Sequence, residues 1–161
     1  MTPGRIACLR SGGQTGADRA ALDAGVECGV AVAGWCPAGG WAEDLPEPPG
    51  LLARYPRLRP TPSADPAVRT AWNVRDADAT LVISLSSASP SAGTELTVAA
   101  ARGLSRPLLV TDGTDVASVL DFLDAVGRGL TVNVAGPRES EAPGTYARTL
   151  ALLRDVLRRR D

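Results

Sequence analysis

Short apolar runs alternate with segments of helical periodicity along the whole chain, and this alternation sets the narrowest bounds on its fold. Each run is nearly free of charged residues, which is typical of strands covered on both faces of a parallel sheet. The runs span residues 6–9, 30–35, 79–85, 107–111 and 130–134. They predict one α/β domain over residues 1–161, a doubly wound, Rossmann-like sheet of about five mainly parallel strands with helices on both faces.

The segments between these runs carry signals that mark helix ends. Asp65 precedes Pro66, which predicts an N-cap followed by a proline at the first helical position. Gly103 and Gly127 predict the ends of two later helices. The chain closes on several arginines, which we interpret as a solvated helix end at the negative pole of the helix dipole, so that a nucleic-acid partner is not expected.

Residues 43–66 hold seven prolines, at 46, 48, 49, 56, 60, 62 and 66. Proline fixes φ and removes a backbone donor, so this segment excludes a regular helix and favours an extended, ordered arm inserted in the domain. Long loops in compact domains often serve a site or an interface. A lid, an oligomer contact and a surface excursion without function all remain open for the arm.

The 17 basic residues are all arginine, because the chain has neither lysine nor histidine. Schiff-base chemistry, a P-loop lysine and any Ser-His-Asp or Cys-His pair are therefore excluded. Cys8, Cys28 and Cys36 form no CxxC pair, so we expect no protein-ligated metal. The net charge is only −1 and no membrane span or secretory leader is evident, so we expect a soluble, cytoplasmic protein without a membrane partner.

Two Gly-rich turns each follow a strand-like run and precede a helical segment. The first runs from Ser11 to Asp18, and the second runs from Ser89 to Glu95. Glycines permit close backbone approach, and the following helix N-terminus supplies free N–H groups and a positive dipole end, which suits a phosphate. We expect Thr94 to cap the second helix. The alternatives are a tight turn capped by Thr15, and a Glu95 that only complements the helix dipole.

In such sheets, ligands bind beyond the carboxyl ends of the strands, where the strand order reverses. If the runs at 6–9 and 79–85 are neighbours, the two turns flank one crevice. A heteroaromatic ring could stack on Trp35 or Trp41 there, although core or interface packing explains both tryptophans equally well. The predicted ligand-binding residues are Ser11, Gly12, Gly13, Gln14, Thr15, Gly16, Trp35, Cys36, Arg69, Asn73, Gly93, Thr94, Glu95 and Arg138.

Five stretches of sequence together resemble the family of molybdenum cofactor carrier proteins, which is related to the LOG-type, lysine-decarboxylase-like proteins of a Rossmann-like superfamily. The resemblance implies a doubly wound sheet, a crevice lined by the two Gly-rich turns, and homo-oligomers that are dimers or tetramers. It also implies a phosphate-bearing heterocycle as ligand, with molybdenum cofactor as cargo whose metal takes its sulfur ligands from the pterin. The stretches are SGGQTGADRAALDA (11–24), GWCP with AED (34–37, 42–44), RTAWNVRDADATLV (69–82), GTELT (93–97) and NVAGPRES (133–140).

The chain departs from this family at the turn after its second run. Typical members read CPKGRRAED where this chain reads CPAGGWAED over residues 36–44, so basic residues expected to meet an anionic ligand are absent. The family's Gly-Gly-Thr is Ala92-Gly93-Thr94 in this chain. Because each charge-assisted hydrogen bond is worth roughly 1.5–3 kcal/mol, the first change predicts a different ligand choice or a lower affinity for a multiply charged cofactor.

The residues favour a binding protein over an enzyme, with two alternatives. One is a LOG-like nucleoside 5′-monophosphate phosphoribohydrolase, which cleaves an N-glycosidic bond; here Thr97 stands where related enzymes place a catalytic glutamate. The other is a nucleotide-sensing module that changes its oligomeric state. With no histidine or lysine, an enzyme would need a carboxylate as acid or base. The catalytic candidates are Asp18, Glu43, Asp44, Asp76 and Glu95, with Arg69 beside them.

Overall fold

The computed structural model describes residues 3–85 and 90–159, and its centre is a sheet of six strands paired in parallel throughout. The strands lie in the order β3-β2-β1-β6-β4-β5. The predicted fold class, a single Rossmann-like α/β domain, is confirmed, with one strand more than expected. The strands are β1 (Ile6–Arg10), β2 (Ala31–Cys36), β3 (Leu58–Pro60), β4 (Ala79–Ile83), β5 (Leu108–Thr111) and β6 (Leu130–Ala135).

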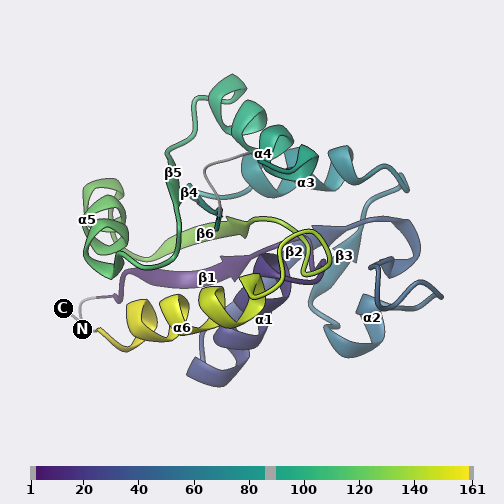
Figure 1. The fold of residues 1–161 in the computed structure, drawn as a ribbon, viewed down its shortest axis with the longest axis horizontal. Coiled ribbons are helices and arrows are strands. Elements are labelled where there is room, and N and C mark those ends of the chain that lie inside the picture. The colour runs from purple at the N-terminus through teal and green to yellow at the C-terminus, as the bar shows by residue number, and fades with distance from the viewer. Residues whose placement is uncertain (1–2, 86–89, 160–161) are drawn as a thin grey trace.

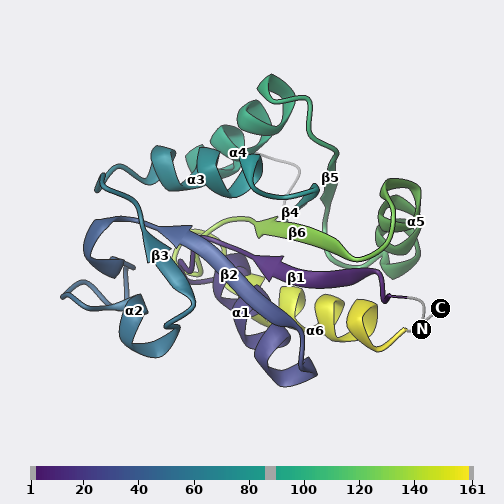
Figure 2. The same ribbon diagram turned by 180° about the vertical axis from the view of Figure 1, so that it is seen from behind.

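Helices cover both faces of this sheet (Figures 1 and 2). One layer holds α1 and α6, which pack against each other, together with α5; the other holds α3 against α4. The predicted helix ends at Gly103 and Gly127 and the N-cap at Asp65 are confirmed. The helices are α1 (Ala17–Cys28), α2 (Leu51–Arg54), α3 (Pro66–Arg75), α4 (Ala92–Gly103), α5 (Val116–Val126) and α6 (Thr145–Arg158), with a 3-10 turn η1 (Ala38–Gly40).

The two faces of the sheet differ in polarity. Toward α1, α5 and α6, side chains such as Leu81, Ile83 and Val134 join one apolar core. Because successive side chains of a strand point to opposite faces, Thr80 and Asn133 point toward α3 and α4, and both are buried. The layer of α3 and α4 therefore covers a face with polar groups, and this is the face on which the candidate site lies.

The Pro-rich arm is ordered by an apolar cluster of its own. Leu51, Tyr55 and Leu58 of the arm are buried against Leu22 of α1, and the cluster also holds Ala42. The expectation that the prolines exclude a regular helix is wrong for α2, because this single turn fits between Pro49 and Pro56 and contains no proline itself. β3, which pairs with β2, is the strand that the sequence did not predict.

The runs at 6–9 and 79–85 are not neighbours, so the strand order on which the two-turn crevice was based is wrong. β6 lies between β1 and β4 and pairs with both. The chain reaches β5 through α4 on one face and returns through α5 on the other, which brings the last strand into the middle of the sheet. The two turns therefore lie one strand further apart than expected.

Candidate functional site

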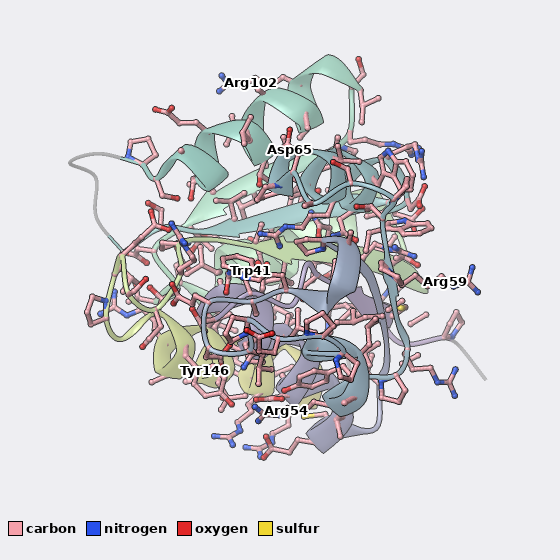
Figure 3. All side chains as sticks on the ribbon, turned by 90° about the vertical axis from the view of Figure 1, so that its right-hand side faces the viewer. Trp41, Arg54, Arg59, Asp65, Arg102 and Tyr146 are labelled. Carbon is pink, nitrogen blue, oxygen red and sulfur yellow. The ribbon has the colours of Figure 1, made fainter. Side chains whose placement is uncertain are left out.

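A cleft of about 310 Å³ opens beyond the carboxyl ends of the strands. It lies between the first Gly-rich turn, the starts of α3 and α4, the loop after β6 and the arm. Figure 3 faces this end of the molecule, with Trp41 near the middle and Asp65 above it. The lining residues are Gln14, Asp18, Trp41, Asp65, Pro66, Ala67, Arg69, Ser91, Ala92, Gly93, Leu96, Gly136, Arg138 and Glu141.

A smaller chamber of about 40 Å³ lies between the cleft and the sheet. Four residues line both spaces, namely Asp18, Arg69, Gly93 and Gly136. The chamber exceeds the roughly 10–15 Å³ that one water molecule needs, and its walls combine polar and apolar groups in similar measure. Its other lining residues are Gly12, Thr70, Asn73, Thr97, Asn133, Val134 and Ala135.

Asp18 and Arg69 form a buried ion pair at the junction of the cleft and the chamber. Arg69 Nη1 donates to Asp18 Oδ2 at 2.8 Å, and Gln14 N donates to the same oxygen at 3.3 Å. Asp18 is only 5% exposed, and this burial raises the pKa of its carboxyl above the usual range although Arg69 opposes the shift. The pair thus places a carboxylate of raised basicity beside a guanidinium.

Arg69 has hydrogen-bonding capacity that no described residue uses. Its side chain is 14% exposed, and its Nε atom is buried without a partner among residues 3–85 and 90–159. Gly12 makes room for this side chain, since a Cβ at position 12 would lie 1.7 Å from Arg69 Nη1. Buried guanidinium donors are rarely left unpaired, so an additional acceptor at this point would be favourable.

Hydrogen bonds of its own side chains hold the first Gly-rich turn in place. Ser11 Oγ donates to Asp18 O and accepts from Gly13 N, while Gln14 Oε1 accepts from Thr15 N and Glu43 N. Of the six predicted residues of this turn, Gln14 lines the cleft and Gly12 lines the chamber. The turn is therefore held by its own side chains, and direct contact of its residues with a ligand stays a prediction.

The second turn enters α4 through Ser91, whose Oγ accepts from Thr94 N at 3.1 Å. Thr94 was expected to cap the helix, but α4 begins two residues before it, so its hydroxyl only contacts Ser91 at 2.8 Å. Gly93 lines both spaces, while Thr94 is buried and Glu95 points outward on α4. Ser89, where the predicted turn begins, lies outside the described residues.

Among the five candidate acid–base carboxylates, Asp18 alone lines the two spaces. Asp44 instead receives hydrogen bonds from both terminal nitrogens of Arg19 at 2.8 Å. Glu43 accepts from Ser140 and Thr15, which lower its pKa against the effect of burial. Asp76 is held by Arg75 and by the indole of Trp35, and these contacts lower its pKa to about 2. Glu95, as noted, points outward from α4.

The other predicted residues divide between the site and its support. Asn73 lines the chamber and also brackets the backbone of Trp35, with its amide within 2.9 Å of both the N and the O of that residue. The Trp35 ring packs edge-on against Trp72, with centroids 4.9 Å apart, and Cys36 is buried in the cluster beneath the arm. Trp35 and Cys36 thus lie apart from the cleft walls, whereas Trp41 forms part of them.

Arg138, in the loop after β6, is the second arginine of the cleft. Its Nε donates to Glu141 Oε1 at 2.8 Å, its Nη1 lies 3.8 Å from Glu43 Oε2, and its side chain is 43% exposed. The described residues that line the cleft include three carboxylates, Asp18, Asp65 and Glu141, and two arginines. This mixed lining can both donate to and accept from a ligand.

Several lining residues escaped prediction from the sequence. Asp65 was identified only as a helix cap, a role that it fills by accepting from Ala67 N at 2.9 Å while also lining the cleft. Asn133 begins the NVAGPRES stretch and Glu141 directly follows it. Their nearness to Arg138 in the sequence was therefore an available signal. Ser91 would have followed from a correct placement of the α4 cap.

No helix within residues 3–85 and 90–159 is both long and apolar enough to cross a membrane. Within the same part of the chain, no three His, Cys, Asp or Glu side chains gather closely enough to hold a metal ion.

Comparison with known proteins gives one family and one similar structure. The model of the circularly permutated YpsA SLOG family matches residues 9–157. A crystal structure of a "putative molybdenum carrier protein" from Syntrophus aciditrophicus superposes with a TM-score of 0.84 at 33% sequence identity, covering 98% of each chain. The curated proteins contain no match to the chain.

Proposed function

The chain belongs to the circularly permutated YpsA SLOG family, and we propose that it is a non-enzymatic carrier of a phosphate-bearing heterocycle, with molybdenum cofactor as the foremost candidate cargo. The observation that carries the proposal is Arg69, a nearly buried guanidinium at the junction of two spaces, whose Nε has no partner in the part of the chain that the structure describes. The similar structure from Syntrophus aciditrophicus, described as a molybdenum carrier, supports the choice of cargo.

Arg69 and Arg138 would meet the phosphate of the ligand. Guanidinium groups bind phosphate oxygens through paired N–H donors, and Arg138 is exposed enough to turn from Glu141 toward a stronger acceptor. The start of α4 at Ser91 and Gly93 adds a hydroxyl and backbone N–H groups on the same side of the cleft. Asp65 and Glu141 would accept hydrogen bonds from those N–H groups of the heterocycle that face the cleft.

The proposal is tested by loading purified protein with molybdenum cofactor and passing it through gel filtration. The molybdenum content of the protein fraction and the fluorescence of its oxidised pterin are then measured. Arg69→Ala should lose most of the cargo. Arg154→Ala is the matched control, because Arg154 pairs with Glu27 at 2.9 Å between α6 and α1, away from the cleft. Equal retention by the wild type and Arg69→Ala would contradict the proposal. Light scattering in the same runs would test the dimer or tetramer that we also propose.

A second candidate function is hydrolysis of nucleoside 5′-monophosphates, and Asp18 is the observation in its favour. Asp18 and Thr97 line the same chamber, so a carboxylate of raised pKa lies close to the position at which related enzymes carry a glutamate. In this reaction a water molecule would give one proton to Asp18 while its oxygen bonds to the anomeric carbon and the C–N bond to the base breaks. Asp18 would then pass that proton to the departing base, which leaves neutral, and return to its ionised form. Chromatography of nucleotide mixtures after incubation tests it: release of base by the wild type but not by Asp18→Asn supports hydrolysis.

A further inference from the structure

A third space, which we call the Trp41 pocket, lies beside the cleft between the turn at residues 38–41 and the arm. Its volume is about 380 Å³, which falls in the range of small-molecule sites. None of the described residues that line it is charged, in contrast to the five charged side chains of the cleft. The lining residues are Ala38, Gly39, Trp41, Pro46, Pro48, Ala64 and Pro66.

Trp41 and Pro66 line both the Trp41 pocket and the cleft. The indole of Trp41 therefore forms part of the boundary between an apolar space and a charged one. Trp41 is 37% exposed, whereas its neighbour Ala42 is completely buried in the cluster beneath the arm. A large aromatic side chain is thus kept at the surface by a backbone that is itself anchored.

The turn that presents Trp41 is rigid. Gly40 has a φ of 71°, and a Cβ there would lie 2.3 Å from Pro49 O, so this position requires glycine and packs directly against the arm. After Trp41, Ala42 and Leu45 exchange backbone hydrogen bonds across a tight antiparallel bridge. Proline walls add stiffness, so the pocket is preformed and a ligand would lose little by ordering it.

We propose that the Trp41 pocket is a second subsite, which takes the planar heteroaromatic ring of the same ligand whose phosphate binds at Arg69 and Arg138. This inference rests on the proposed function, since it needs a phosphate anchored in the cleft. An uncharged space offers a phosphate no partner, whereas an indole face and proline rings are favourable surfaces for a flat, partly apolar ring. The Trp41 pocket would therefore choose among phosphate-bearing ligands by their rings.

Calorimetric titration with three probes separates the two subsites. The probes are neopterin monophosphate, which has ring and phosphate; neopterin, which has only the ring; and glycerol phosphate, which lacks the ring. Trp41→Ala should weaken the binding of neopterin monophosphate by about tenfold, the scale of one ring–aromatic stack, and leave glycerol phosphate unchanged. Trp41→Phe should retain most of the affinity, because a phenyl ring still stacks.

Two further variants serve as a second test of the pocket and as a control. Ala64→Phe fills the pocket from an exposed position and should reduce binding of the ring-bearing probes without touching the cleft. Trp35→Phe, which changes a tryptophan outside both spaces, should bind all probes as the wild type does. Unchanged affinity of Trp41→Ala and Ala64→Phe for neopterin monophosphate would overturn the second subsite.

The same titrations distinguish failure of this inference from failure of the proposed function. If Arg69→Ala loses neopterin monophosphate while Trp41→Ala retains it, the phosphate site stands and the ring site does not. If the wild type binds neither phosphate-bearing probe, the proposed function and the inference both fail.

Discussion

Gly12 and Arg69 lie so close together that no side chain fits between them. A Cβ at position 12 would lie 1.7 Å from Nη1 and 2.9 Å from Cδ of Arg69. The same Nη1 donates to Asp18, so the backbone of the first Gly-rich turn, a residue of α1 and a residue of α3 meet at one point. The glycine therefore sets where the guanidinium of the candidate site can lie.

Gly12→Ala should displace Arg69 and weaken ligand binding while the protein stays folded. The clash is with the far end of a flexible side chain, which can swing away, so we expect a loss of stability of at most about 1–3 kcal/mol, the usual cost of overpacking. Gly103→Ala on α4 is the control, because a Cβ there meets nothing within 4 Å. Calorimetry of cargo binding and thermal unfolding measure both effects; full affinity in Gly12→Ala would mean that Arg69 is not needed where it lies.

Asp18 should make the stability of the protein fall as pH rises through the acid range. The pKa of Asp18 is raised in the folded state, so the folded protein holds its proton more tightly than the unfolded chain does. The contribution is present in full below the unfolded pKa of about 3.9 and is lost as pH rises through the folded pKa. Urea unfolding of the wild type and Asp18→Asn at several pH values tests this. The free energy of unfolding of the wild type minus that of the variant should decrease as pH rises. An increase would mean that the effect of Arg69 on the pKa of Asp18 outweighs the effect of burial.

Signals that act over a few residues predicted most of the fold. The apolar runs located five of the six strands, and the Asp65-Pro66 pair and Gly127 marked helix ends that the structure confirms. The family indicated by the motifs is confirmed by the family model and the similar structure. The insertion of β6 between β1 and β4 depends on which face each crossing helix covers, and no local pattern records that choice.

The candidate site was predictable in its chemistry but not in its geometry. Arg69 and Asn73 were both among the predicted ligand-binding residues, and both line the chamber, where Arg69 meets Asp18 from a distant segment. Which of Trp35 and Trp41 lines the cleft could not be predicted, because Trp35 lies at the end of β2 and Trp41 follows that strand by only a few residues. Trp35 is kept from the cleft because its ring packs against Trp72 and donates to Asp76. Both contacts form only when the chain folds.

Leu51→Ala should loosen the arm more than the rest of the molecule. Leu51 is fully buried, and one of its methyl groups would lie 2.9 Å from a Cβ at Gly13, so it packs the arm directly onto the first Gly-rich turn. Removal of a buried leucine side chain costs about 2–5 kcal/mol. Hydrogen exchange should quicken in residues 42–60 and change little in β4 and β6. Leu104→Ala, at a position 45% exposed, should leave hydrogen exchange unchanged both in the arm and in the sheet. Uniformly faster exchange in Leu51→Ala would mean that the arm and the sheet unfold as one unit.

Asp23 should hold both tyrosines of the chain in their neutral form to unusually high pH. Its carboxylate accepts from the hydroxyls of Tyr55 in the arm and Tyr146 in α6, which ties these elements to α1. Burial and this hydrogen bond raise the pKa of Tyr146 to about 12 and also raise that of Tyr55. Since the chain contains only two tyrosines, absorbance at alkaline pH reports on these two alone.

Asp23→Ala should shift the pKa of the tyrosines toward the ordinary value of about 10 and destabilise the fold by about 1–3 kcal/mol. Glu27→Ala, which breaks a partly exposed ion pair on the same helix, should leave the titration unchanged. An Asp23→Ala protein that still titrates as the wild type does would show that burial alone keeps the tyrosines neutral.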